Sequence, residues 1–436
     1  MIKQKSRDIY LFGRYIQALI IIFITALVLI NETVKFDTIS FLFILLIIQS
    51  VLLIFFVSEN LTLHSLYYIF SFFFYSLVPY IEYQTGTIYW TNLYFNEFAY
   101  YIVNIFLLSF NFFLCFLFRS SRMEKQFTGS FYVVNSKGFY KLLALLLIAI
   151  SLIVKLYLVD FNVLRAFYNS NYFDIEVEYT PIRLVLATIS TYLPLLILII
   201  FNKKNKVIFY FSILVIIFNS FPTSTPRFVV ASLYIPILII LFPKLIKGTK
   251  FCYLMLLSLL LIFPFLENFR NYSDGDKLTF IPTRTFFLNG HFDSYQSLLR
   301  VVSENIITYG EQLIGNLLFF IPREVWPDKS IGSGHFMAQK LGYSFENISM
   351  NFFGEAYINF GVLGLIIYGG GAAFVLTKIE INRKNNPIFH FIKIIMIGFI
   401  IMFLRGDFLV VYSKLFTIIV MFYFVSKIFI LKSKNR

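Results

Sequence analysis

Apolar runs long enough to cross a lipid bilayer recur along almost the whole chain. An upright helix needs about 20 apolar residues to span the hydrocarbon core, and the first run, Leu11–Ile30, is about that long. Hydrophobic residues make up 59% of the chain and charged residues only 14%, which excludes a soluble globule of this length. Because every backbone polar group must be bonded internally in hydrocarbon, helices are expected. The sequence therefore predicts an all-α polytopic membrane protein.

Twelve segments are candidate spans, and one long polar interruption, Glu267–Met350, separates the last three from the rest. The chain then divides into residues 1–266 with nine transmembrane helices, the loop 267–350, and residues 351–436 with three. Four spans, those starting at Val207, Phe228, Phe251 and Phe389, are shorter than an upright helix needs, so we expect their outer ends to border a sunken cavity. The twelve segments are Leu11–Ile30, Ile39–Val57, Leu61–Ile81, Phe98–Phe118, Phe139–Val159, Ile182–Phe201, Val207–Phe221, Phe228–Phe242, Phe251–Leu266, Phe352–Leu376, Phe389–Leu404 and Phe408–Leu431.

Basic residues gather in alternate connections, which predicts the orientation of the chain. Loops rich in lysine and arginine stay in the cytoplasm, so both termini are expected there and the loop 267–350 outside. The formal net charge of +14 is explained by this topology, without nucleic acid as a partner. The basic residues on the cytoplasmic side are Lys3, Lys5, Arg7, Arg119, Arg122, Lys125, Lys137, Lys203, Lys204, Lys206, Lys244, Lys247, Lys250, Lys378, Arg383, Lys384, Lys432, Lys434 and Arg436.

Within the long loop, apolar residues recur at steps of three and four, which predicts an amphipathic helix lying on the outer surface. Such a helix could simply pack on the bundle or could gate a substrate, and the pattern fits both. The apolar positions are Phe292, Tyr295, Leu299, Val302, Ile306, Tyr309, Leu313 and Phe320.

Three arginines, Arg227, Arg270 and Arg405, stand at the outer ends of spans, against the positive-inside bias. A guanidinium is a rigid, permanently charged fork that matches phosphate oxygens bidentately, so several of them suit a pyrophosphate. The alternative is that each reaches singly to the interface or pairs with a neighbouring acid such as Glu267 or Asp407. Arg405-Gly406-Asp407 is expected to be a turn that directs Arg405, with Asp407 restraining it.

A carboxylate and two amides share one helical face at the start of the tenth span, since Asn351, Glu355 and Asn359 are spaced four apart. Glu355 is a candidate general base, and it could equally be the structural partner of an arginine. His335 is another candidate proton acceptor, although a lone loop histidine is more often simply exposed.

The sequence predicts no cofactor and no metal. Cys115 and Cys252 both lie inside apolar runs, which leaves neither a disulfide framework nor a cysteine metal site. Asp274-Gly275-Asp276 has a carboxylate spacing seen in metal-dependent nucleotide-sugar transferases, but nucleotide sugars are absent outside the cell, and the tetrapeptide beginning at Ser273 is an ordinary turn.

Two further segments are distinctive: residues 320–329, FIPREVWPDK, and residues 354–364, GEAYINFGVLG. Both resemble segments of the Wzy family of O-antigen and capsular polysaccharide polymerases. The twelve predicted spans, the large outer loop late in the chain and the turn at Arg405-Gly406-Asp407 are similar to that family as well. The topological resemblance covers nearly the whole chain, and the resemblance in sequence is confined to about these segments.

The resemblance implies a GT-C-like membrane glycosyltransferase that polymerises polyprenyl-pyrophosphate-linked oligosaccharide repeat units on the outer face of the cytoplasmic (inner) membrane. Its substrate would be the lipid-linked oligosaccharide, with a chain-length regulator as a candidate protein partner. Developing pyrophosphate charge needs preorganised cations, so arginines replace a metal here. The expected cations are Arg227, Arg270, Arg323 and Arg405; Glu355 is the expected base, with Asp407 and His335 as substitutes. Trp326 could stack on a sugar ring or anchor the loop at the interface.

Two other functions fit the same composition. An O-antigen ligase has the polymerase's architecture and differs mainly in its acceptor, so it is the nearest alternative. A lipid-oligosaccharide flippase also has about a dozen spans, but transporters favour internal repeats and short loops, and this chain has one dominant loop and no visible duplication.

Overall fold

The structure is a computed structural model that describes residues 2–29, 35–57, 60–123, 132–135, 137–167, 180–201, 205–262, 283–288, 290–383 and 386–432. These residues are helical and looped apart from two strands of three residues each and an isolated bridge. The chain forms two compact units. Unit 1 consists of Met1–Met123, Pro243–Tyr309 and Gly334–Thr377, and unit 2 consists of Glu124–Phe242, Gly310–Ser333 and Lys378–Arg436.

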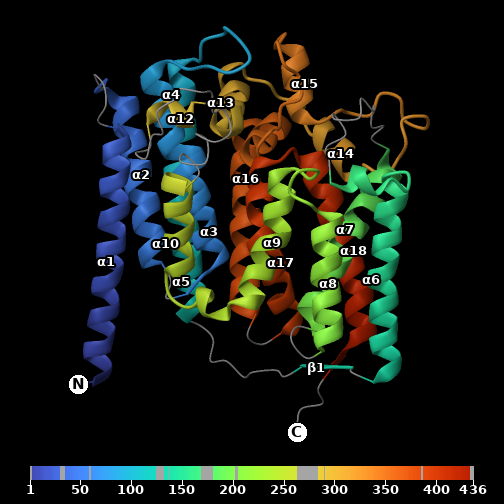
Figure 1. Cartoon of the computed structure of the whole chain (residues 1–436). Helices are drawn as coiled ribbons and strands as arrows, with labels where there is room; N and C mark the ends of the chain where they lie inside the picture. The colour runs from blue at the N-terminus through green and yellow to red at the C-terminus, as the bar shows by residue number, and fades with distance from the viewer. Residues whose placement is uncertain are drawn as a thin grey trace, which may run out of the picture. The chain divides into compact units, whose positions relative to one another are not determined.

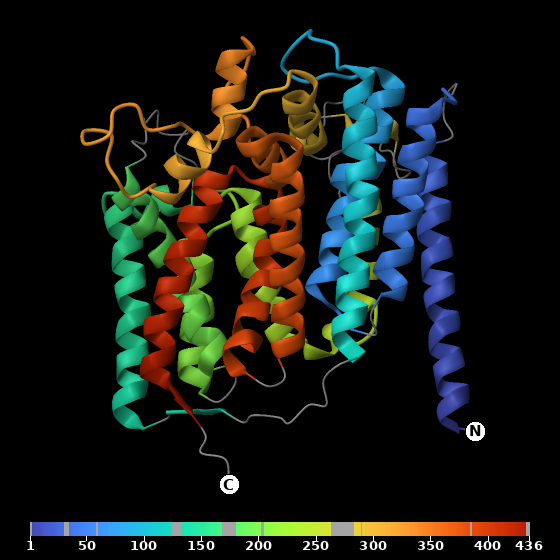
Figure 2. The ribbon, with the colours of Figure 1, turned by 180° about the vertical axis from the view of Figure 1, so that it is seen from behind.

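Unit 1 is built around α2, which packs against α1, α3, η1 and α5 (Figures 1 and 2). Its start follows from a local signal, since the Asp37 side chain accepts a hydrogen bond from the backbone N–H of Ser40 at 2.8 Å. The elements of unit 1 are α1 (Ile2–Leu29), α2 (Thr38–Phe56), α3 (Leu63–Phe70), the π-helical η1 (Ser71–Leu77), α4 (Val78–Thr85), α5 (Glu97–Met123), η5 (Pro243–Ile246), α10 (Lys250–Leu257), η6 (Ser258–Ile262), α12 (Arg284–Phe287), η7 (Gly290–Phe292), α13 (Ser294–Ser303), all but the first residue of α15 (Ser333–Lys340), and most of α16 (Phe352–Asn382).

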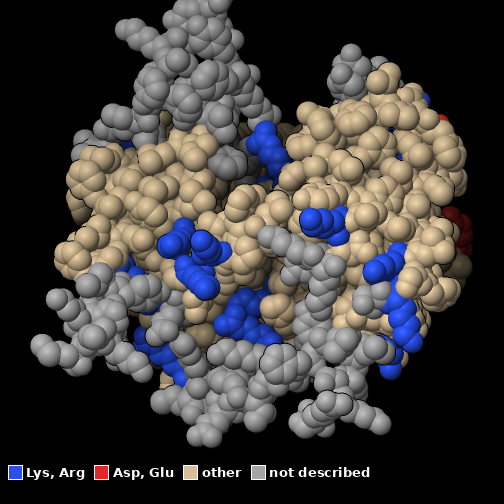
Figure 3. Space-filling model, turned by 60° about the horizontal axis from the view of Figure 1, so that its bottom comes forward, with Lys and Arg blue, Asp and Glu red and all other residues tan. Residues whose placement is uncertain are grey.

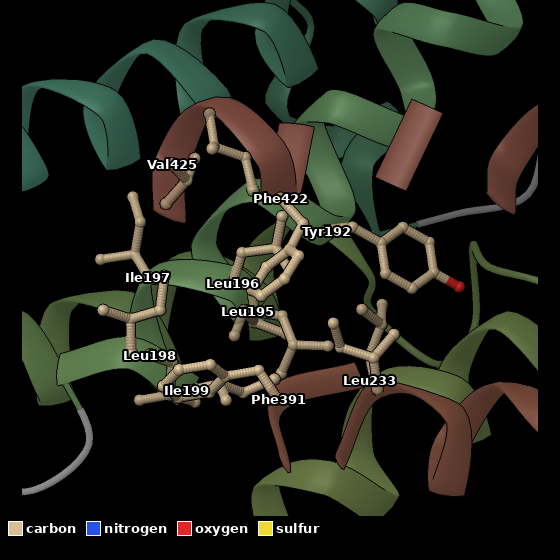
Figure 4. Packing of buried hydrophobic residues seen from close by; sticks show 14 of the residues in the cluster. Tyr192, Leu195, Leu196, Ile197, Leu198, Ile199, Leu233, Phe391, Phe422 and Val425 are labelled. Carbon is tan, nitrogen blue, oxygen red and sulfur yellow. The ribbon is translucent and has the colours of Figure 1, made fainter. Parts of the chain in front are cut away.

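Unit 2 is built around α7, which packs against α6, α8, α9 and α18, while α17 packs against α9 (Figure 1). Residues from α7, α9, α17 and α18 meet in its apolar core, where Leu195, Leu233 and Phe391 are buried (Figure 4). The elements of unit 2 are β1 (Tyr132–Val134), α6 (Gly138–Leu158), η2 (Val163–Ala166), α7 (Pro181–Phe201), α8 (Lys206–Asn219), α9 (Arg227–Leu241), α14 (Glu311–Leu317), α17 (Pro387–Arg405), α18 (Phe408–Phe429) and β2 (Ile430–Lys432), together with the end of α16.

Among the described residues, eight helices are long and apolar enough to cross a membrane. This confirms the prediction of an all-helical, multi-pass membrane protein. The segment predicted as the third span is also helical from Leu63 onward, in the successive pieces α3, η1 and α4. Three further apolar helices, Lys206–Asn219, Arg227–Leu241 and Lys250–Ile262, are shorter. The total of twelve spans stays a prediction.

One of the four predicted short spans is longer than expected. Helix α17 has 19 residues, because it begins at Pro387 behind Asn386, whose side chain accepts a hydrogen bond from Ile388 N–H at 2.9 Å. A proline at the start of a helix costs nothing, since its missing N–H has no helical partner there. Helices α8 and α9, with 14 and 15 residues, are as short as predicted.

The predicted amphipathic helix in the long loop is wrong in two respects. It is not continuous, because α13 ends at Ser303 and α14 begins only at Glu311, with left-handed backbone at Asn305, Tyr309 and Gly310 in between. It is also not a surface helix over its first half, since every residue from Ser294 to Val302 is buried. The apolar period is real, but polar positions such as Gln296 and Arg300 are buried as well. Backbone groups in unit 1 form hydrogen bonds with both side chains.

At one end of the helices, the charged side chains on the described surface are mostly basic. In unit 2, β1 pairs antiparallel with β2, with Tyr132 opposite Lys432, so the chain before α6 meets the chain after α18 at this end. Figure 3 views the molecule from that direction, and lysine and arginine side chains predominate over acidic ones on the described surface. This is the charge pattern of a cytoplasmic face; which side of a membrane it occupies stays a prediction.

Candidate functional site

The predicted tenth span is two helices, and Glu355 lies in the first of them. The backbone leaves helical geometry at Phe360 (φ −142°, ψ 20°) and Gly361 (φ 60°, ψ −143°), so α16 consists of a short helix, 352–359, and a long one, 362–382. The chain turns back at the break, because a Cβ on Gly364 would lie only 1.9 Å from the carbonyl oxygen of Ala356. The prediction of one uninterrupted span over Phe352–Leu376 is therefore wrong.

Asn351 starts the short helix and joins it to α13. Its side-chain oxygen accepts a hydrogen bond from Gly354 N–H at 2.7 Å, as an N-cap residue does. Its side-chain N–H group donates to the Ser294 carbonyl and, at 3.2 Å, to the Ser297 hydroxyl. The amide that the sequence placed beside Glu355 thus holds the helix carrying Glu355 against α13.

Asn359 ends the short helix and bonds to Glu355. Its side-chain N–H group donates both to the backbone carbonyl of Glu355, at 2.9 Å, and to the carboxylate oxygen Oε1, at 3.1 Å. Asn351, Glu355 and Asn359 all have fully buried side chains, which confirms that they share an inward face. The Glu355 carboxylate is therefore held in a defined direction by an amide on its own helix.

His335 occupies a different environment, at the surface of unit 1. It lies in α15, and Nδ1 is 3.2 Å from the carbonyl oxygen of Glu346 and 3.6 Å from its carboxylate oxygen Oε2. Gln339 also donates to that carboxylate oxygen, at 3.3 Å. These contacts join α15 to the chain that follows it, a bonding pattern that suits a structural role for His335.

In unit 2, Arg405 and Arg227 come from the adjoining ends of two packed helices. Arg405 is the last residue of α17, and Arg227 is the first of α9. The Arg405 guanidinium carbon lies 4.7 Å from the ring centre of Phe228, the residue after Arg227, so the cation rests on an aromatic face. Arg405 is half-buried and Arg227 is exposed.

Asp407 is placed by the turn after Arg405. Its side chain accepts a hydrogen bond from Leu409 N–H at 3.2 Å and so caps the start of α18. A Cβ on Gly332 would lie 3.0 Å from Asp407 Oδ1, so the loop before α15 passes directly against this carboxylate. The expected turn at residues 405–407 is confirmed, and Asp407 is the N-cap of the helix that follows it, α18.

Arg323 folds the loop in which it lies. Its terminal nitrogens donate to the backbone carbonyls of Lys329, at 2.8 Å, and Ser330, at 3.3 Å. The Lys329 ammonium donates in turn to the carbonyls of Phe319 and Ile321. Burial lowers the pKa of Lys329, and the nearby Arg323 cation lowers it further. The FIPREVWPDK segment is thus a self-bonded loop, on which Trp326 is half-buried.

The predicted site residues fall into two groups. Glu355 and His335 belong to unit 1, whereas Arg227, Arg323, Trp326, Arg405 and Asp407 belong to unit 2. Arg270 lies outside the described residues, as does Asp274-Gly275-Asp276. Within the part of the chain that the structure describes, no three His, Cys, Asp or Glu side chains come close enough to hold a metal ion.

Sequence reasoning missed a second buried carboxyl group in unit 1. Glu82 lies one residue beyond the predicted span Leu61–Ile81 and is only 3% exposed. Burial raises the pKa of its carboxyl to about 8; Gln296 and Tyr89 oppose this shift by stabilising the anion, and Asp293 adds to it. A loop acid followed by the aromatic run Tyr89-Trp90 was the available signal, but nothing in the sequence placed α13 over it.

A second omission was Arg300 of α13, whose side chain is fully buried. It donates to the backbone carbonyls of Leu93 and Tyr94, at 2.5 and 3.2 Å, and to Glu304 at 3.1 Å, and it lies over the Phe95 ring. It therefore holds the connection between α4 and α5 on α13.

No family model, curated protein or solved structure matches this chain.

Proposed function

We propose that the protein is a membrane glycosyltransferase that polymerises polyprenyl-pyrophosphate-linked oligosaccharide repeat units, as the resemblance to the Wzy family implies. The observation that carries the proposal is the pair of arginines at the adjoining ends of α9 and α17, with Arg405 held over Phe228. Two guanidinium groups on packed helix ends suit the two phosphates of a pyrophosphate leaving group.

The residue roles follow from the chemistry of the reaction. As the bond between the growing chain and its lipid carrier breaks, negative charge develops on the pyrophosphate, and Arg227 and Arg405 stabilise it. Glu355 accepts the proton of the acceptor hydroxyl as the new glycosidic bond forms. Arg323 contributes less to the leaving group than the sequence predicts, because two of its nitrogens are bonded to loop carbonyls. Trp326 is the candidate for stacking on a sugar ring.

The topology belongs to the same proposal. All twelve apolar segments cross the cytoplasmic membrane, both termini lie in the cytoplasm, and the loop 267–350 lies outside, in a GT-C-like arrangement. Eight spanning-length helices and the helical form of the remaining segments support this topology, and the predominance of basic side chains at one end supports the orientation.

The test is gel electrophoresis of surface polysaccharide from a deletion strain, with wild type and a complemented strain alongside. Loss of polymerase activity is expected to collapse the long ladder to a single repeat unit. Full-length polymer that accumulates on its lipid carrier would instead identify a ligase. Repeat units trapped on the cytoplasmic side would identify a flippase, and an unchanged ladder would contradict the whole proposal.

A further inference from the structure

The break in α16 leaves backbone groups that need partners. A helix that stops at residue 359 deprives its last carbonyl oxygens of their usual N–H donors four residues on. In a membrane protein such irregular backbone persists only where other protein groups or water satisfy it. Gly361 makes the break possible, since its φ of 60° and ψ of −143° fall in a region that is essentially restricted to glycine.

Thr308 supplies the partner for one of these carbonyls, that of Ile358. The backbone N–H of Thr308 donates to it at 2.7 Å, and the hydroxyl donates to the same oxygen at 2.9 Å. Thr308 lies in the connection between α13 and α14, far from Ile358 in the sequence. Two groups of Thr308 therefore donate hydrogen bonds to the same carbonyl oxygen, at the point where the helix stops.

The neighbours of Thr308 also contact the end of the short helix. Asn305 accepts a hydrogen bond from the Tyr357 hydroxyl at 3.0 Å, and Ile307 Cδ1 lies 3.0 Å from the position that a Cβ on Gly361 would take. The connection 304–309 thus follows the end of the short helix and leaves only a tight space beside Gly361, against the end of the Ile307 side chain.

Ile358 lies next to Asn359, whose side chain bonds both to the Glu355 carbonyl and to the carboxylate oxygen Oε1. The direction of the Glu355 carboxylate therefore depends on the orientation of Asn359, and that orientation depends on where the short helix stops. Thr308 therefore affects the direction of the Glu355 carboxylate indirectly, through the backbone of the short helix, without contact with a substrate.

We propose that Thr308 is a positioning residue for Glu355: by bonding the Ile358 carbonyl it fixes the end of the short helix 352–359 and, through Asn359, the direction of the carboxylate. This inference rests on the proposed function, because it assigns Glu355 the role of base. It also explains why a connecting loop carries a threonine that bonds to a helix remote in sequence.

The experiment compares Thr308→Val, Thr308→Ser and Thr25→Val in purified protein in lipid nanodiscs. The substrate probe is the lipid-linked repeat unit extracted from the same strain. Valine keeps the backbone N–H bond and removes the hydroxyl, whereas serine keeps both. Thr25 donates to Ile21 O at 2.7 Å within α1 of the same unit, so Thr25→Val removes a similar buried bond far along the chain from Glu355. Backbone hydrogen–deuterium exchange of residues 352–362 is measured in parallel.

Thr308→Val is expected to lower kcat about tenfold, the equivalent of one hydrogen bond, with KM unchanged. Thr308→Ser restores kcat to near wild type, and exchange in 352–362 accelerates only in Thr308→Val. A kcat for Thr308→Val equal to that of Thr25→Val overturns the inference, as does an equal loss in Thr308→Ser. If even the wild-type protein joins no repeat units, the proposed function fails, and exchange alone decides the structural step: unchanged exchange in Thr308→Val overturns it.

Discussion

The candidate site residues of the two units differ in how deeply they are buried. In unit 1, Glu355 is fully buried on a short helix whose beginning and end are both closed by asparagine side chains. In unit 2, Arg405 and Arg227 stand at helix ends, one half-buried over a phenylalanine ring and the other exposed. The carboxylate accepts a hydrogen bond from an amide on its own short helix, whereas the arginines lie at helix ends, and one of them rests on an aromatic ring.

This difference corresponds to the two tasks in the proposed reaction. A base must hold one oxygen in line with one hydroxyl, so its direction benefits from being set before the substrate arrives. Cations that receive a pyrophosphate must match several oxygens on a ligand that carries a long lipid, and guanidinium forks at helix ends suit that task. Substitutions in unit 1 should therefore lower activity by moving or removing the base, and substitutions in unit 2 should lower it by removing positive charge.

The largest effect is expected from Glu355→Gln. Glutamine keeps an oxygen that can accept from Asn359, so the fold is retained, but it cannot take a proton. Loss of a general base lowers kcat about a thousandfold, or ~4 kcal/mol. The measurement is polymer yield per unit time by the purified enzyme, with Glu97→Gln, an exposed carboxylate at the start of α5 in the same unit, as control. Normal polymerisation by Glu355→Gln would leave Glu355 as scaffold only.

Arg405→Ala follows, with a loss of about a hundredfold in kcat from the missing charge on the leaving group. Arg405→Lys keeps the charge without the fork and should fall between alanine and wild type. Lys427→Ala, which removes an exposed cation near the other end of α18, is the control and should polymerise normally. Equal activity in Arg405→Ala and Lys427→Ala would remove the arginine pair from the mechanism. Arg227→Ala should resemble Arg405→Ala.

Gly361→Ala tests the break in α16 directly. A side chain at φ 60° and ψ −143° is strained, and it meets Ile307, so a destabilisation of about 2 kcal/mol is expected. Gly370→Ala is the matched control in the long part of α16, where a Cβ meets nothing within 4 Å; it should be neutral or slightly stabilising. Thermal unfolding in detergent measures both. Equal Tm values for the two variants would contradict the broken helix.

Glu82→Gln should change how stability depends on pH. The folded pKa of Glu82 is about 8 and the usual glutamate value is 4.5, so the folded protein binds the proton more tightly. The contribution of Glu82 to stability is then fully present below pH 4.5 and falls by about 1.4 kcal/mol per pH unit as the pH rises towards 8. Glutamine cannot ionise, so Glu82→Gln should lose this slope, as seen in Tm measured from pH 5 to pH 8. Parallel curves would show that Glu82 does not titrate in this way.

The smallest effect is expected from Arg323→Ala, about 1 kcal/mol of stability, since it removes two hydrogen bonds from an exposed guanidinium to loop carbonyls. Polymerisation should fall less than in Arg405→Ala. Glu324→Ala, at an exposed neighbouring position, is the control for both measurements. An activity loss as large as that of Arg405→Ala would show that Arg323 contributes to pyrophosphate binding as the sequence predicts.

Much of the architecture was predictable because it depends on local hydrophobicity. The first predicted span, Leu11–Ile30, matches α1 as far as that helix is described, to Leu29, and the last, Phe408–Leu431, matches α18 to its end at Phe429. The helical spacing of Asn351, Glu355 and Asn359 also predicted correctly that they share a buried face. Spacing along one helix is a property of the chain alone, so it can be read without knowing what packs against it.

The failures have a common cause. The period from Phe292 to Phe320 indicated one amphipathic helix, yet the backbone leaves helical geometry at Asn305 and Tyr309, and α13 and α14 belong to different units. On an amphipathic surface helix, polar residues such as Arg300 and Gln296 would face solvent, but carbonyls from the loop after α4 accept hydrogen bonds from them in the interior. Periodicity shows where apolar atoms recur, and it contains no information on which distant carbonyl will receive a buried donor.

The sequence by itself determined that this chain is a bundle of apolar helices with an acid between two amides, because hydrophobic run length and helical spacing act within a few turns. Only the tertiary structure decided that α16 stops at Gly361, that Thr308 bonds the carbonyl left at the break, and that Arg405 rests on Phe228. The physical reason is that a broken helix and a seated cation are stable only when groups distant in sequence satisfy them.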